Sequence, residues 1–531
     1  MRLTVEQIVK NFVDLETIEY DHEYSRLAKI HKYWSRKPWF VIEKYISKYS
    51  KEKDLVLDPF CGSGLFGLEA ILQNKNFVGY DLNPFAIFLA ENTLNQNFDS
   101  KEFDAEFEQI KSDLKSKIMA LYNTKFGYLL YAILGKKNSK KYNAVLSNEN
   151  FKSKKQVYLE EKDLKPEVKM PKNLYFPDRD FPKEFYKDRF SYKGVSKVSH
   201  IFTKRNLLAL ALLYNELKSK DLIYRDYFYL AFTNTLLHVS KLKAENVRPL
   251  SVNNYWIPDD YIEENVWWRF EDRVKNVKIA KTTYLKRVEK SKNESLGSYK
   301  LYNKSSLKMS EITGESVDYL ITDPPYGDAI QYSELSFVWN TWLEKIFDTK
   351  EEVIINPVQN KGINEFNDQI QDFVNEAWRV LKNDGYFTLC FQNKNPKIWI
   401  SIAEMIYHKG MKLVDISSYD TFGCPYNKNW AQFSPKSDFY VTFKKDKNIS
   451  DHKADMEIKP EQIAVQIAQY LKKYNGKLFN LNKGYDLFVG VVIKKIFDGY
   501  KVVNYEKLTI KNIILMLEES IKYGHKQRQL F

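Results

Sequence analysis

Leu55–Gly64, which reads L-V-L-D-P-F-C-G-S-G, decides the fold of this 531-residue chain. The apolar run up to Asp58 is typical of a buried strand, and Leu65–Leu72 after the glycines is typical of a helix. Glycines at a turn between a strand and a helix let the backbone approach a ligand closely. In open α/β sheets the ligand crevice lies outside the carboxyl ends of the strands. The stretch therefore predicts the first βα turn of a nucleotide-binding sheet.

A second strand is predicted at Asn76–Tyr80, and it ends in Asp81. An acid about 20 residues after a glycine turn suits the diol of a ribose, so we expect a cofactor that contains a nucleoside. Asp58 stands where it would repel a pyrophosphate. A cationic sulfonium cofactor therefore fits this turn better than a dinucleotide.

Far along the chain, the apolar run Val317–Thr322 predicts another buried strand, and Asp323-Pro324-Pro325-Tyr326 follows it. The two prolines fix φ and remove backbone donors, so the loop leaves the strand with carbonyls free to accept hydrogen bonds. Asp323 and a loop carbonyl can together accept both protons of an exocyclic amine, and Tyr326 can stack on the ring that carries the amine. The alternative interpretation of the tetrapeptide is an ordinary turn after a strand.

The motifs Asp58-Pro-Phe-Cys-Gly-Ser-Gly, Asp81-Leu-Asn-Pro and Asp323-Pro-Pro-Tyr together resemble those of the DNA amino-methyltransferases, which use S-adenosylmethionine. The resemblance implies a doubly wound, Rossmann-like methyltransferase sheet. It assigns catalysis to Asp323, Pro324, Pro325 and Tyr326. It assigns cofactor binding to Asp58, Pro59, Phe60, Gly62, Ser63, Gly64, Asp81 and Asn83.

The segment His31–Trp39, H-K-Y-W-S-R-K-P-W, resembles the stretch that such enzymes place before the glycine turn to complete the methionine pocket. This resemblance adds Ser35 and Lys37 to the expected cofactor contacts, and the alternative is a basic aromatic surface turn. One departure concerns the cofactor's adenine. The family often has an acid on the strand before D-P-P-Y to hold the adenine amine, whereas this chain offers the hydroxyls of Ser305 and Ser306.

The function that the resemblance implies is transfer of a methyl group to the exocyclic amine of a base flipped out of double-stranded DNA. Aspartate at the head of the motif favours adenine N6, and cytosine N4 is the alternative because the same geometry reaches it. An RNA base methyltransferase and a catalytically silent DNA-binding subunit are further alternatives. Transfer to carbon 5 of cytosine needs a cysteine nucleophile in a Pro-Cys pair, whereas the chain has only Cys424-Pro425 in the reverse order.

The composition agrees with a nucleic-acid partner. A net charge of +13 and an aromatic content of 15% suit a polyanion whose bases can be stacked. The three cysteines are too few and too scattered for a disulfide framework or a zinc site, so we expect no metal. No apolar stretch approaches the roughly 18 residues of a membrane span, and the first residues lack a signal-peptide core. We therefore expect a cytoplasmic protein without a membrane partner.

The order of the motifs predicts four parts. Residues 1–98 hold the first part of the catalytic domain, and residues 300–445 hold the second part with D-P-P-Y. The residues between them, 99–299, are too many for a crossover connection and are expected to form an inserted, largely helical domain that is the candidate target-recognition domain. Residues 446–531 are expected to form a helical C-terminal extension. This extension is interpreted as a DNA-binding part, a dimerisation part, or a contact for a restriction or specificity subunit.

Within the predicted insert, Arg205–Leu217 and Tyr227–Leu242 have the apolar density of two buried helices. The lysine-rich stretch 135–155 is interpreted either as a solvated linker or as a loop that contacts phosphates. The whole chain is thus expected to be an α/β protein whose doubly wound sheet carries a large, mainly helical insert and a helical C-terminal extension.

Overall fold

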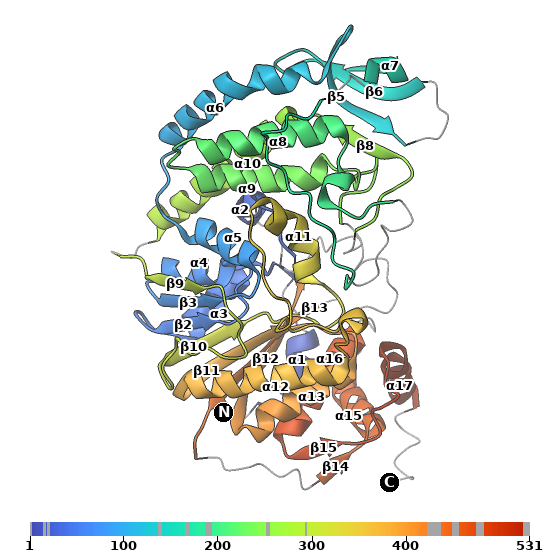
Figure 1. Ribbon diagram of the computed structural model, residues 1–531. Helices are drawn as coiled ribbons and strands as arrows, with labels where there is room; N and C mark the ends of the chain where they lie inside the picture. The colour runs from blue at the N-terminus through green and yellow to red at the C-terminus, as the bar shows by residue number, and fades with distance from the viewer. Residues whose placement is uncertain are drawn as a thin grey trace.

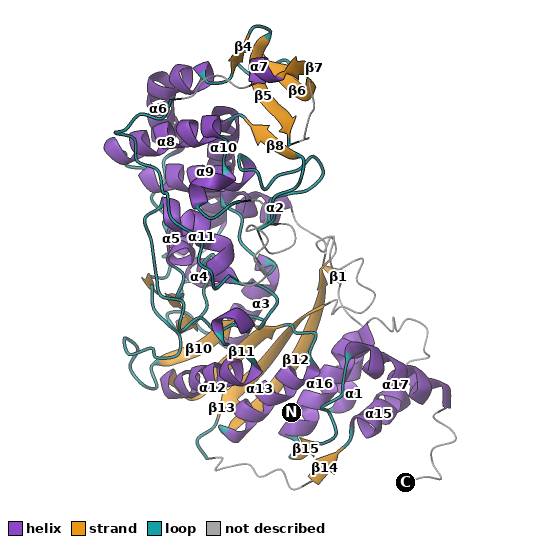
Figure 2. Cartoon of the chain, turned by 45° about the vertical axis from the view of Figure 1, so that its right-hand side comes forward, coloured by secondary structure: helices purple, strands orange, loops and turns teal. Residues whose placement is uncertain are grey.

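The computed structural model of the chain describes residues 3–13, 17–18, 22–34, 36–135, 141–164, 169–185, 194–250, 255–291, 295–421, 437–448, 456–473 and 483–523. A central mixed sheet with helices on both faces forms the body of the molecule (Figures 1 and 2). The chain is therefore an α/β protein, as predicted. Among the described residues, no helix combines the length and the apolarity that crossing a lipid bilayer requires.

The central sheet has eight strands in the order β1-β12-β13-β11-β10-β2-β3-β9. The five strands from β11 to β9 in this order are parallel to one another, whereas β13 is antiparallel to both β11 and β12. Along the chain the sheet grows from β2 through β3 to β9, and it then resumes on the other side of β2 with β10. β2 and β10 therefore flank the topological switch point, where open α/β sheets bind ligands. The strands are β1 (Thr17–Ile18), β2 (Leu55–Asp58), β3 (Asn76–Tyr80), β9 (Tyr299–Tyr302), β10 (Val317–Thr322), β11 (Leu381–Phe391), β12 (Met411–Thr421) and β13 (Ser437–Lys445).

Strand β10 is buried on both faces, which agrees with the apolar run from which the strand was predicted. Leu320 belongs to one apolar core, and Tyr319 and Ile321 belong to another on the opposite face. The second core contains helices α3 (Trp39–Tyr49), α4 (Leu65–Leu72) and part of α5 (Pro84–Leu94). The first core contains α1 (Val5–Val13), α12 (Ile363–Val380), α13 (Pro396–His408) and α16 (Gly484–Phe497). The two layers of helices hold the sheet, and with it the strand ends that carry the motifs.

The chain between β3 and β9 forms a stack of helices above the central sheet and a second sheet beyond them (Figures 1 and 2). The two helices predicted at Arg205–Leu217 and Tyr227–Leu242 are confirmed as α8 and α9, although α9 ends at His238 rather than at Leu242. The elements of this region are α6 (Ser100–Ala120), β4 (Asn123–Thr124), β5 (Gly127–Leu134), β6 (Lys141–Ser147), β7 (Lys155–Glu160), α7 (Glu161–Leu164), α8 (Lys204–Ser219), α9 (Arg225–His238), β8 (Tyr261–Glu264) and α10 (Val266–Lys290).

The second sheet was not predicted. It joins β4, β5, β6 and β7, and β8 pairs with β5. The lysine-rich stretch that suggested a linker or a loop contains β6, whose Ala144 and Leu146 are buried. The described lysines of this stretch lie at the start of β6, in the turn after it and at the start of the edge strand β7. Charged side chains on an edge strand protect a sheet from pairing with other chains. The lysines around β6 therefore outweighed its short apolar run Ala144–Leu146.

Helix α10 connects this stack to the central sheet through a buried ion pair. The guanidinium of Arg287 donates to both carboxylate oxygens of Glu69 in α4, at 2.6 and 2.7 Å. The helix also packs against α2 (His22–Leu27). Because a bidentate arginine–carboxylate pair fixes distance and orientation together, it sets the position of the helical stack relative to the helix that follows the glycine turn.

The C-terminal part adds α15 (Pro460–Lys473), α16 and α17 (Ile510–Tyr523), with the two-stranded sheet of β14 (Met456–Ile458) and β15 (Tyr500–Val502). Helix α16 packs against α13 and α1. The hydroxyl of Tyr485 in α16 donates to the backbone carbonyl of Asn393 at 2.7 Å, and the side-chain amide of Asn393 donates to the carbonyl of Tyr326 at 3.1 Å. Helix α16 thus supports the D-P-P-Y loop through Asn393.

Replacing Tyr485 by phenylalanine should lower the free energy of unfolding by about 1 kcal/mol, because it removes one buried hydrogen bond and leaves the carbonyl of Asn393 without this donor. Urea denaturation followed by circular dichroism measures the change. The matched control is Tyr158→Phe, since Tyr158 is 69% exposed and should tolerate the loss of its hydroxyl. Equal stability of the two variants would contradict a supporting role for Tyr485.

Candidate functional site

The glycine loop, Pro59–Gly64, joins β2 to α4 at the carboxyl edge of the sheet. It borders a pocket of about 890 Å³, part of which is open to solvent. The φ angles of Gly62 and Gly64 are +48° and +77°, in the left-handed region. A Cβ atom on Gly62 would lie 2.8 Å from the ring of Tyr33, and one on Gly64 would lie 2.9 Å from Ala90. Both the backbone conformation and the lack of space therefore require glycine at these positions.

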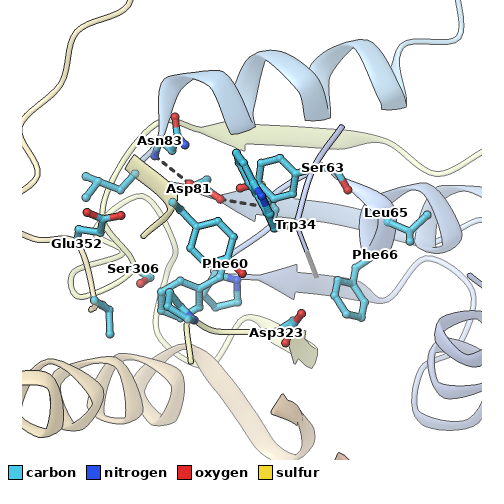
Figure 3. Close-up of a pocket in the computed structure, with 18 of the residues that line it drawn as sticks. Trp34, Phe60, Ser63, Leu65, Phe66, Asp81, Asn83, Ser306, Asp323 and Glu352 are labelled. Atoms are coloured by element: carbon cyan, nitrogen blue, oxygen red, sulfur yellow. Dashed lines mark hydrogen bonds between the residues drawn. The ribbon is translucent and has the colours of Figure 1, made fainter. Parts of the chain in front are cut away.

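Asp81 follows β3 and lines the same pocket. Its carboxylate accepts hydrogen bonds from the backbone N–H of Gly62 at 3.0 Å and from that of Asn83 at 2.9 Å, which Figure 3 draws as dashed lines. Burial raises the pKa of Asp81 to about 7, although both N–H donors act against the rise. The side-chain amide of Asn83 donates to Ser336 in α11 (Tyr332–Trp342) at 2.8 Å. The acid is thus anchored between the glycine loop and α11.

Asp58 ends β2 and is fully buried. Its Oδ1 accepts from the hydroxyl of Thr322 at 2.6 Å and from the backbone N–H of Phe60 at 3.1 Å, which joins the ends of β2 and β10. No donor among the described residues reaches its Oδ2. Burial raises the pKa of Asp58 to about 8, and the two donors at Oδ1 oppose this rise. Because Asp58 does not line the pocket, its carboxyl links the ends of β2 and β10 rather than contacting a ligand directly.

Asp323 follows β10 and meets Lys37, which precedes α3. The ammonium of Lys37 is 3.3 Å from Oδ2 of Asp323, and the hydroxyl of Tyr326 donates to Oδ1 at 2.5 Å. Burial raises the pKa of Asp323 to about 6, while Lys37 and Tyr326 act against the rise. Burial also disfavours the charge of Lys37, but the carboxylates of Asp323 and Asp438 outweigh this effect and hold its pKa above the ordinary value. At neutral pH the site therefore holds an ionised aspartate against a charged lysine.

Tyr326 is 8% exposed. Its ring packs edge-on against Phe391, with a centroid distance of 5.4 Å, and the ammonium of Lys37 lies 5.2 Å from the ring centroid. Lys37 also donates to the Tyr326 hydroxyl at 2.5 Å. The ring thus lies beside the pocket rather than in its wall.

Most of the predicted site residues meet at this one pocket. Figure 3 shows Asp81 and Asn83 toward one side of it and Asp323 toward another, with Phe60 between them. Asp58, Gly64, Pro324 and Tyr326 belong to the same loops but do not line the cavity, and Ser35 lies outside the described residues. The predicted residues on the wall are Lys37, Pro59, Phe60, Gly62, Ser63, Asp81, Asn83, Ser305, Ser306, Asp323 and Pro325.

Several residues at the site were not predicted. Tyr33 and Trp34 stand on the pocket wall, and Tyr33 stacks on Tyr332 of α11 with centroids 6.0 Å apart. The sequence does point to these two residues, because they lie in His31–Trp39, the segment that resembles the methionine-pocket stretch. Glu352, which accepts from the backbone N–H of Ser333 at 2.9 Å, also lines the pocket. Its position and that of Asp438 depend on the tertiary fold, so no local pattern in the sequence indicates them.

Comparison with known proteins gives a family match for the first part of the chain. Residues 7–92 match a family model described as DNA methylase. The matched segment contains His31–Trp39, the glycine loop and Asp81. The match thus falls on three of the stretches from which the resemblance was predicted.

Two relatives match the chain over short segments. The chain is 35% identical over 65 residues to the Type II methyltransferase M2.LlaDCHI of Lactococcus lactis subsp. cremoris, which covers 12% of this chain and 24% of the relative. It is 35% identical over 77 residues to the Type II methyltransferase M.HpaI of Haemophilus parainfluenzae, which covers 14% of this chain and 24% of the relative. The chain thus spans about a quarter of the length of the curated relatives it matches. The family match and these relatives confirm the predicted resemblance to the DNA amino-methyltransferases.

Proposed function

We propose that this chain is a DNA methyltransferase that uses S-adenosylmethionine to methylate the exocyclic amine of a base flipped out of the duplex, with adenine N6 as the target. The observation that carries the proposal is the geometry at the switch point between β2 and β10. The glycine loop, Asp81 and Asp323 border one cavity, although they come from three different strand ends. Acceptors suited to a ribose and to an amine therefore share one ligand site.

The residues around the pocket fit S-adenosylmethionine. Asp81 would accept hydrogen bonds from the ribose hydroxyls, and the glycine loop would surround the amino-acid part. Asp58 does not line the cavity, but it would hold the start of the loop in place through its hydrogen bond from the backbone N–H of Phe60. Ser305 and Ser306 would contact the adenine. Bound there, S-adenosylmethionine supplies a methyl group on a positively charged sulfur.

The target amine would be held by the carboxylate of Asp323 and the carbonyl of Pro324. Two acceptors that bind both amine protons turn the nitrogen lone pair out of conjugation with the ring, which makes the nitrogen nucleophilic. Holding the amine in line with the methyl group supplies much of the acceleration. The nitrogen must lose one proton when it is methylated, and our candidate acceptor is Asp323, which is ionised above its pKa of about 6.

The base must leave the duplex to reach this site, at a cost of a few kcal/mol. Stacking on Tyr326 would offset part of this cost. Because the Tyr326 ring packs against Phe391 and its hydroxyl bonds to Asp323, stacking requires the ring to turn toward the pocket. Base binding and the release of the Tyr326 hydroxyl from Asp323 are therefore coupled in our proposal.

We further propose the division of labour along the chain. Residues 1–98 and 300–445 would form the catalytic domain, a doubly wound, Rossmann-like methyltransferase sheet. Residues 99–299 would form an inserted target-recognition domain for double-stranded DNA, consistent with the net charge of +13. Residues 446–531 would form a C-terminal extension, which supports the D-P-P-Y loop through Tyr485 and is a candidate contact for a restriction or specificity subunit.

Long-read sequencing of DNA from methylation-free cells that express the chain tests this function. We expect N6-methyladenine at one recurring sequence and none in cells that express Asp323→Ala. Marks on cytosine N4 would reverse the choice of base. A lack of marks on DNA that is also seen with purified chain and tritiated cofactor would contradict the proposal and favour RNA or a silent subunit.

A further inference from the structure

Lys37 links two carboxylates at the site, and only one of them belongs to a predicted motif. Its side chain is 3% exposed, and its ammonium is 3.3 Å from Oδ2 of Asp323 and 3.5 Å from Oδ1 of Asp438. The three residues come from separate segments, since Lys37 precedes α3, Asp323 follows β10 and Asp438 lies at the start of β13. A buried charge is stable only when opposite charges offset its desolvation. The fold therefore brings two acids to one lysine.

We propose that Lys37 and Asp438 are positioning residues that set the charge and the availability of Asp323. Lys37 keeps the carboxylate of Asp323 ionised, and Asp438 takes over the lysine when a substrate amine binds to Asp323. The inference rests on the proposed function, because Asp323 is an amine acceptor only there.

Asp438 is needed because both oxygens of Asp323 already have partners. Oδ1 accepts from the Tyr326 hydroxyl, and Oδ2 pairs with Lys37. A substrate amine therefore competes with these partners for the charge of the carboxylate, and this weakens the hold of Asp323 on Lys37 even where the Tyr326 hydroxyl is released from Oδ1. If Lys37 moved away without a second acid, a buried ammonium would lose its counter-charge, which is strongly unfavourable. With Asp438 at 3.5 Å, a small displacement of the ammonium keeps it paired.

The charges around Asp323 explain why Lys37 is needed for ionisation. The groups that face this carboxyl are Asp438 of β13, Asp58 of β2, Cys390 of β11, Tyr326 of its own loop, and Lys37. Lys37 alone among these groups carries a positive charge. Burial and Asp438 both favour the protonated form of Asp323, and its pKa is already about 6 with Lys37 present. Without the lysine the carboxyl would be protonated over much of the neutral range.

The first test is the pH dependence of methyl transfer from tritiated S-adenosylmethionine to DNA from methylation-free cells. Transfer requires ionised Asp323, so its rate falls as the pH drops through the pKa of that group. Lys37→Met should move this acidic fall to higher pH by about one to three units. Asp438→Asn should move it to lower pH and also lower the plateau rate, because the lysine then stays on Asp323. The double variant should lie closer to the wild-type profile than Lys37→Met does.

The matched control is Lys445→Met. Lys445 is also a buried lysine of β13, with 2% of its side chain exposed, but it donates to the carbonyls of Trp378 and Leu381 away from the pocket. The Lys445→Met substitution should lower the stability of the protein without moving the acidic fall of the transfer rate. Acidic falls at the same pH in Lys37→Met, Asp438→Asn and wild type would overturn the inference.

The resemblance suggests that Lys37 contacts the cofactor. Isothermal titration calorimetry with S-adenosylhomocysteine distinguishes a cofactor contact from the positioning role proposed here. We expect Lys37→Met to bind S-adenosylhomocysteine as wild type does. Weaker binding together with an unmoved acidic fall would overturn the positioning role.

A third measurement does not depend on activity. Lys37→Met leaves two acids close together in a buried site, so its denaturation midpoint should fall, and adding Asp438→Asn should recover part of the loss. Additive effects of the two substitutions would show that the residues are not coupled and would overturn the inference. A wild-type chain that transfers no methyl group would contradict the proposed function, while this series still tests the coupling of Lys37 and Asp438.

Discussion

Asp323→Ala is expected to reduce the rate of methyl transfer by about 10²–10³-fold or more, because it removes the charged acceptor that would hold the target amine. Binding of S-adenosylhomocysteine should persist, since the glycine loop after β2 and Asp81 after β3, which are expected to hold the amino-acid part and the ribose, are unchanged. The fold should also survive, because Lys37 keeps Asp438 as a counter-charge at 3.5 Å. Transfer to DNA from methylation-free cells and isothermal titration with S-adenosylhomocysteine measure the two properties separately.

Asp328→Ala is the matched control, because Asp328 follows the same motif but is 39% exposed, and its ion pair within the described part of the chain is a long one with Lys394, at 3.8 Å. It should transfer methyl groups at close to the wild-type rate. Asp323→Asn keeps one carbonyl acceptor and should fall between wild type and Asp323→Ala. Transfer that survives in Asp323→Ala would contradict the proposed mechanism, and loss of cofactor binding in the same variant would point to a structural role instead.

The sequence predicted the parts of the site that depend on local geometry. An apolar strand followed by glycines with positive φ is a local pattern, and so is a strand followed by two prolines. The adjacency of these loops was implied by the resemblance to the DNA amino-methyltransferases, and it agrees with the rule that ligands bind outside the carboxyl ends of the strands. The predicted helices α8 and α9 were found because apolar density over more than ten residues is a strong signal.

The two main unpredicted features have different causes. Asp438 reaches the site because β13 inserts antiparallel between β11 and β12, and no residue near Asp438 indicates which strands flank it. The second sheet was missed because the lysines of the β6–β7 hairpin outweighed the short apolar run Ala144–Leu146. The pairings from β4 to β7 are local, and in this sheet only the pairing of β8 with β5 joins distant segments.

Gly64→Ala is expected to weaken the binding of S-adenosylhomocysteine roughly 30-fold. The left-handed backbone at Gly64 would cost about 1–2 kcal/mol with a side chain. The added Cβ would also lie 2.9 Å from the Cα and Cβ of Ala90, which is fully buried in α5 and cannot yield. The loop must therefore shift. Such a shift would break the hydrogen bond from Gly62 to Asp81 and the expected contact of Asp81 with the ribose. At about 1 kcal/mol each, these two losses correspond to the roughly 30-fold weaker binding.

Gly194→Ala separates the two causes. Gly194 has a similar φ of +67°, but no atom of the described residues lies within 4 Å of the position of its Cβ. This variant should therefore show the backbone strain as a loss of stability of about 1–2 kcal/mol, with unchanged binding of S-adenosylhomocysteine. Gly64→Ala should show a similar or larger loss of stability together with weaker binding. If both variants bound the ligand as wild type does, the glycine loop would not contact the cofactor, because the close packing of Gly64 on α5 would then have no consequence at the pocket.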